Sequence, residues 1–145
     1  MPRSIRGGLA ALSVVAALAA AQSAAAVSRE PAAETPFLPG VEIERPSVDL
    51  DRVLRRQQLV VSYSCMEACQ PFMRLRVAGI AISTFDPPGG PTAGSRRAVF
   101  ELGRRDRRTI VSHTHGGVAT FRIGAVFTNK APARATEALR FRLRR

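Results

Sequence analysis

Alternation of apolar and polar side chains is the feature that most constrains how this chain can fold. From residue 57 to the C-terminus, apolar residues recur at every second position in several short segments. A period of two places one face of a β-strand against a core and the other face in water. The longest such segment runs from Val118 to Thr128, and we expect it to be a central core strand. Its apolar positions are Ala119, Phe121, Ile123, Ala125 and Phe127.

Shorter segments with the same alternation lie before and after it. Their apolar positions fall within 59–63, 73–77, 98–102, 109–115 and 139–143. Gly79 changes the phase, because Ile80 and Ile82 follow on the opposite parity, and this indicates a bulge or bend. A helix over 133–143 competes with the last segment, since Ala, Glu, Leu and Arg are good helix formers, but strict alternation favours a strand. Turns are predicted at 86–91, 103–107, 116–117 and 129–132.

These segments predict an all-β fold for residues 57–145. About six to seven short strands, joined by turns rich in Gly and Pro, are typical of a small antiparallel β-sandwich. A βαβ fold would need helices between the strands, and no segment has a convincing pattern for one. The chain of 145 residues has room for one such domain, which excludes a multidomain enzyme.

The first 26 residues have the composition of a secretory signal peptide. Arg3 and Arg6 form a basic start, 9–21 is an apolar run, and 24–26 fits an A-x-A cleavage site. A retained membrane anchor is the alternative, but the apolar run is shorter than the roughly 20 residues that span a bilayer. We therefore expect a secreted or periplasmic protein with no transmembrane anchor after cleavage.

Residues 27–56 are predicted to be an acidic, Pro-rich and poorly ordered linker. One helical turn is an option near its end, where Leu50, Val53 and Leu54 are spaced i, i+3, i+4 with Ser47 or Asp49 as N-cap. The alternative is an irregular segment that leads into the first strand. Because the chain carries 22 Lys and Arg against 11 Asp and Glu, this acidic arm could fold back over a basic body through salt-sensitive contacts.

The strand pattern resembles the immunoglobulin-like or fibronectin-III-like β-sandwich modules of bacterial secreted and surface proteins. The resemblance rests on the run 59–65, the two-cysteine segment ending at Cys69, and the arginine-flanked final strand 139–143. It implies a non-catalytic interaction or spacer module, although a fold analogy alone does not give a function.

Cys65 and Cys69 are predicted to form a disulfide across a hairpin turn, since an exported chain meets an oxidising compartment. The alternative is a zinc or copper site. Two thiolates together with His113 and His115 would complete a tetrahedral set if the strands brought them together. Alternation places both histidines on one strand face, so they could also bind a metal without the cysteines. With the thiols oxidised, we expect no cofactor.

No enzymatic constellation is evident in the sequence. Ser112 neighbours His113, but adjacent residues of a strand point to opposite faces, which argues against an activated serine. A phosphate-binding Gly loop followed by Lys and Ser or Thr does not occur. We therefore predict a protein that is not an enzyme.

Arginines line one face of two predicted strands. If these strands adjoin, they form an anion-binding surface, whereas the alternative is a solvated cationic face with no ligand. A nucleic-acid binder would add exposed aromatic side chains for stacking, and here the aromatics fall mostly on the apolar phase. The residues concerned are Arg74, Arg76, Arg140, Arg142 and Arg144.

The sequence thus predicts an interaction or structural module of the bacterial cell envelope, which binds an anionic envelope polymer or another envelope protein. The second hypothesis is a periplasmic metal-binding protein that uses His113 and His115, with or without Cys65 and Cys69.

Overall fold

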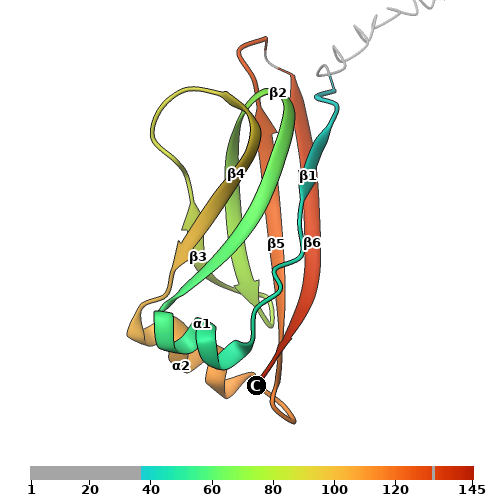
Figure 1. The fold of residues 1–145 in the computed structure, drawn as a ribbon. Helices are drawn as coiled ribbons and strands as arrows, with labels where there is room; N and C mark the ends of the chain where they lie inside the picture. The colour runs from blue at the N-terminus through green and yellow to red at the C-terminus, as the bar shows by residue number, and fades with distance from the viewer. Residues whose placement is uncertain (1–36, 132) are drawn as a thin grey trace, which may run out of the picture. The chain divides into compact units, whose positions relative to one another are not determined.

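A computed structural model describes residues 37–131 and 133–145 (Figure 1). The predicted signal peptide and its cleavage site lie outside these residues. Within them no helix is long and apolar enough to cross a membrane. The elements in chain order are β1 (Val41–Ile43), α1 (Leu50–Arg56), β2 (Gln58–Val77), β3 (Ile80–Phe85), β4 (Thr92–Glu101), α2 (Arg104–Ser112), β5 (Val118–Thr128) and β6 (Arg134–Arg144).

The long strand β2 organises a curled, antiparallel sheet. Its first part pairs with β1 and β4, and its second part pairs with β3 and β5. β6 then pairs with β5, so β5 lies between β2 and β6. Figure 1 shows β2 rising from the α1 end, curving over at the opposite end and running back towards the helices. The prediction of an all-β fold is confirmed.

Burial follows the predicted alternation along β5 and β6. All five predicted core positions of β5 are at most 2% exposed, and Phe141 and Leu143 of β6 are also buried. Phe121 of β5 pairs in register with Phe141, and their rings stack at 5.4 Å between centroids. Residues 134–144 therefore form a strand, as the alternation indicated, and the competing helix does not form.

The region of the two cysteines agrees with the prediction in part. The chain does turn back at this point, but the two halves of β2 pair with different strands and form no hairpin with each other (Figure 1). Cys65 pairs with Gly94 and Cys69 with Thr92, so residues 66–68 of β2 lie opposite the single residue Ala93 of β4. The extra residues of this bulge let β2 bend over between its two sets of partner strands, and its second part runs back towards the helices. Both cysteines remain buried on the two sides of the bulge.

Residues 103–115 also differ from the prediction, which was a turn followed by a strand. The segment forms the helix α2, and Gly103 is its N-cap residue. The Asp106 carboxylate accepts a hydrogen bond from the Gly103 backbone N–H at 2.8 Å, which satisfies a donor at the helix start and places a negative charge there. Ile110 is the α2 residue buried in the core. The apolar alternation in this segment therefore does not come from a strand face that packs on the core. A single buried residue anchors the segment instead.

The prediction of a poorly ordered linker does not hold for residues 37–56. Leu38, Leu50 and Val53 are buried in the core, and β1 pairs with β2. Of the two alternatives near Leu50, the helix is confirmed, and the Asp49 carboxylate caps it by accepting from the Arg52 backbone N–H at 2.6 Å. Three apolar anchors are therefore enough to fold a segment whose prolines suggested a linker.

Candidate anion-binding groove

The arginines predicted to bind anions lie on one outer face of the sheet, but their two strands do not adjoin. β5 lies between β2 and β6 and contributes a further arginine, Arg122. Arg122 pairs in register with Arg76 of β2 on one side and with Arg140 of β6 on the other. Sequence analysis missed Arg122, although it lies on the polar phase of the predicted core strand.

The three arginines form a row across three strands. With adjacent strands about 4.8 Å apart, the row spans roughly 10 Å. Arg142, two residues beyond Arg140 along β6, is a further roughly 7 Å along the strand direction. Their chain neighbours Leu75, Phe121 and Phe141 face the core, so these arginines face solvent.

No carboxylate neutralises this row within the part of the chain that the structure describes. The one ion pair there joins Arg145 Nε to Asp51 Oδ1 at 3.6 Å. β1, which belongs to the predicted acidic arm, pairs with the other part of β2 and not with the groove strands. Like charges directly opposite one another destabilise a sheet. Repulsion between these arginines therefore lowers the stability of the free protein, and a bound anion would reduce that repulsion.

A groove of about 870 Å³ lies over these arginines. Ala138 and Thr120 contribute short side chains to its lining. Both histidines line it as well, whereas Arg74 and Arg144 lie outside it. Its residues are Arg76, Val77, Ala78, Gly79, His113, His115, Val118, Thr120, Phe121, Arg122, Ala138, Arg140 and Arg142.

The two histidines reach the groove from the end of α2 and not from one strand face, which corrects the sequence prediction. His113 is the C-cap residue of α2, and its Nδ1 lies 2.8 Å from the Thr109 carbonyl oxygen. A carbonyl can only accept, so Nδ1 carries the proton and Nε2 is left for a ligand. His115 exchanges two backbone hydrogen bonds with Val118 at the start of β5, which fixes its position.

Ser112 and His113 are closer than a strand would allow. The Ser112 Oγ lies 3.1 Å from His113 Nδ1. However, this hydroxyl also lies 2.9 Å from the Thr109 carbonyl, to which it donates. Because Nδ1 donates to the same carbonyl, it is not free to take the serine proton, and the pair lacks the geometry of an activated nucleophile.

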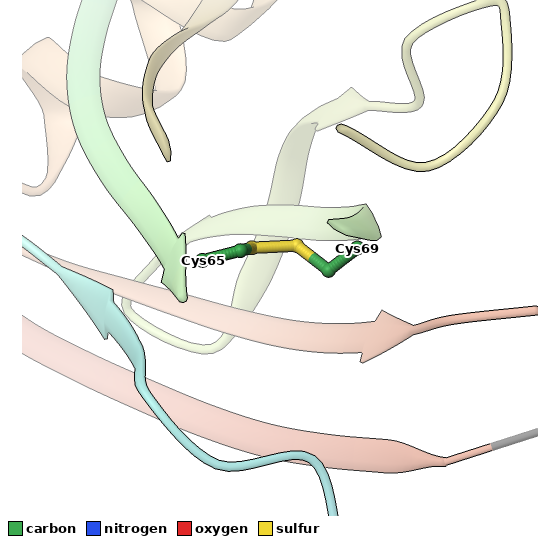
Figure 2. Close-up of a disulfide and its surroundings, with 2 residues drawn as sticks. All are labelled: Cys65 and Cys69. Carbon is green, nitrogen blue, oxygen red and sulfur yellow. A yellow bond between two sulfur atoms is a disulfide. The ribbon is translucent and has the colours of Figure 1, made fainter. Parts of the chain in front are cut away.

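The sulfurs of Cys65 and Cys69 are bonded to each other, as Figure 2 shows. The four-residue zinc set predicted as an alternative is therefore not assembled. Among the described residues, no group of three or more His, Cys, Asp or Glu side chains could hold a metal ion. The disulfide bridges the bulge of β2, and neither cysteine lines the groove.

The groove thus offers guanidinium groups and a hydroxyl to an anion, and two imidazoles also line it. Comparison of the chain with protein-family models, with curated proteins and with solved structures found no match.

Proposed function

We propose that this protein is an exported, non-enzymatic interaction module whose arginine groove binds an anionic polymer of the bacterial cell envelope. The observation that supports it best is the row of Arg76, Arg122 and Arg140, in register on three adjacent strands and without carboxylate partners among the described residues. The fold we propose is an immunoglobulin-like β-sandwich, in which this row lies on an outer face.

The spacing of the groove arginines favours a polymer over a single small anion. One carboxylate or phosphate is satisfied by one bidentate guanidinium. Here four guanidinium groups are distributed over roughly 10 Å across the strands and roughly 7 Å along them, which matches a chain of repeated negative charges. Because these side chains are exposed, each contact is weak and salt-sensitive, and affinity depends on engaging several at once.

Export is the second part of the proposal. It rests on the predicted signal peptide, 1–26, and on the disulfide, since disulfides persist in oxidising compartments. We place the protein in the periplasm or outside the cell, where envelope polymers with carboxylate or phosphate groups are available.

The test compares Arg122→Gln with the matched control Arg97→Gln. Arg97 is an exposed arginine of β4 that does not line the groove, so both changes remove one charge from an exposed strand position. The probes are polyphosphate and polyglutamate at low salt. We expect Arg122→Gln to weaken binding about fivefold, since an exposed charge pair contributes up to about 1 kcal/mol. Arg97→Gln should change it little. Equal losses in the two variants would contradict the proposal. So would wild-type binding that is unchanged in about 0.5 M salt, because salt at that concentration screens exposed charges.

A second candidate function is metal binding by His113 and His115. The observation in its favour is the hydrogen bond from His113 Nδ1 to a backbone carbonyl, an arrangement common for metal-binding histidines. Against it, four groove arginines would repel a cation. Zinc titration followed by calorimetry decides between them. We expect the wild type to show no saturable zinc binding. Saturable binding that is lost in His113→Ala would favour this second function.

A further inference from the structure

A second basic surface lies where α1 and α2 meet at one end of the sheet. Figure 1 shows the two helices next to each other, close to the C-terminus. A shallow pocket of about 480 Å³ lies between them. Its apolar residues are Leu54 of α1 and Val111 of α2, and Val111 is 47% exposed. Its rim consists of Arg104, Arg107, Arg108 and Ser112.

The charge of α2 is almost unopposed. The helix carries four arginines and one acidic residue, Asp106. The Asp106 carboxylate accepts from the Gly103 backbone N–H, and no ion pair of α2 occurs within residues 37–131 and 133–145. Arg104, Arg108 and Val111 are spaced i, i+4, i+7, so they lie along one stripe of the helix. The arginines therefore flank an exposed apolar side chain.

Arg107 supports the view that this pocket takes a ligand. It lines the pocket, and its Nε is a buried donor without a hydrogen-bond partner among the described residues. Buried donors in folded proteins are usually paired, so this one needs an explanation. An anionic oxygen that entered the pocket would supply an acceptor. The long aliphatic stem of arginine can at the same time cover apolar surface.

We propose that the α1–α2 end of the molecule docks on the surface of a bilayer that contains acidic phospholipids. Apolar side chains ringed by arginines are what such a surface requires, since the apolar groups enter the interface and the guanidinium groups bind phosphates. Charge complementarity selects a lipid surface over a second copy of this chain, whose own α1–α2 end is equally positive. This docking surface is separate from the groove and does not depend on it.

The chain contains no tryptophan, which allows a local test. In Val111→Trp the single tryptophan reports on the pocket. In the control Ala93→Trp it reports on an exposed site at the far end of β4, the strand whose C-terminal end leads into α2. We expect vesicles of phosphatidylglycerol and phosphatidylcholine to shift the emission of the Val111→Trp variant to shorter wavelength and to leave the control unchanged. Vesicles of phosphatidylcholine alone should shift neither.

A second step tests the arginines. Adding Arg104→Gln and Arg108→Gln to Val111→Trp should weaken binding to the mixed vesicles on the order of tenfold or more, since each arginine near an anionic surface contributes about fivefold. Adding Arg122→Gln instead should leave the Val111→Trp shift unchanged, which separates this proposal from the groove. Four results would overturn it: no shift, an equal shift at Ala93→Trp, a shift caused by soluble glycerol phosphate alone, or a shift that depends on protein concentration without vesicles.

Discussion

The groove and the α1–α2 end are both rich in arginine, but the neighbours of these arginines differ. In the groove, Arg76, Arg122 and Arg140 are in register on a rigid sheet, with short or polar side chains between them. At the α1–α2 end, Arg104 and Arg108 flank the exposed Val111, and the half-buried Leu54 lines the same pocket. The same residue type therefore suits a chain of repeated charges in one place and a lipid surface in the other. We therefore propose that the side chains around the arginines determine which ligand each surface binds.

The two surfaces also differ in how firmly they are attached to the core. The groove is carried by β5, whose inward side chains are all buried, whereas Ile110 is the buried residue of α2. Ile110→Ala should therefore lower the free energy of unfolding by about 2 to 5 kcal/mol and loosen α2 most. Urea denaturation measures the stability. Hydrogen exchange should show the largest loss of protection in α2.

Binding measurements on Ile110→Ala then sharpen the comparison. The shift of a Val111→Trp reporter on acidic vesicles should be lost, and binding of polyphosphate should persist as long as the protein remains folded. Equal loss of both activities in folded protein would mean that the two surfaces are not independent.

The disulfide provides a stability change that is remote from both surfaces. The double change Cys65→Ser and Cys69→Ser should lower the free energy of unfolding by about 2 kcal/mol, because the bond closes a loop of only a few residues. Neither cysteine lines the groove or the α1–α2 pocket, so ligand binding should not change. Titration of the purified wild type should detect no free thiol. Two reactive thiols with a bound metal would contradict this prediction.

Measuring both ligands on variants of each surface compares the two surfaces more directly. Arg76→Gln with Arg140→Gln should weaken polyphosphate binding about tenfold or more and leave vesicle binding unchanged, since each exposed charge pair contributes up to about 1 kcal/mol. Arg104→Gln with Arg108→Gln should do the reverse. Both double variants remove two positive charges. If binding depended on net charge alone, each variant would lose affinity for polyphosphate and for vesicles alike, and that result would contradict two separate sites.

How far the sequence predicted these regions depends on whether a buried face produced the pattern. β5 and β6 were predicted well because their alternating apolar side chains pack in or against the core. In α2 the alternation of Thr109, Val111 and His113 was misleading, because Val111 is exposed and one buried residue, Ile110, anchors the segment. An Asp three residues after a Gly was the local signal for a helix start there.

The groove was predicted in part for a different reason. The polar phase of each strand identified Arg76, Arg140 and Arg142, but the order of the strands decides which of these arginines become neighbours. β2 and β6 are separated by β5, and this order depends on pairing between residues far apart in the chain. The importance of Arg122 follows from that pairing alone.

Arg96 illustrates a third environment for an arginine, with the smallest expected effect. It lies opposite Tyr63 on β4. Burial raises the pKa of Tyr63 above its ordinary value of 10.0, and the positive charge of Arg96 lowers it by a smaller amount. The folded state thus retains a proton that the unfolded chain releases, so the contribution of Tyr63 to stability is fully present below about pH 10 and is lost as the pH rises through the folded pKa. Tyr63→Phe should remove this decline in urea denaturation above about pH 10. Arg96→Gln should make it steeper, and if it were shallower instead, the charge of Arg96 would not be what acts on the phenol.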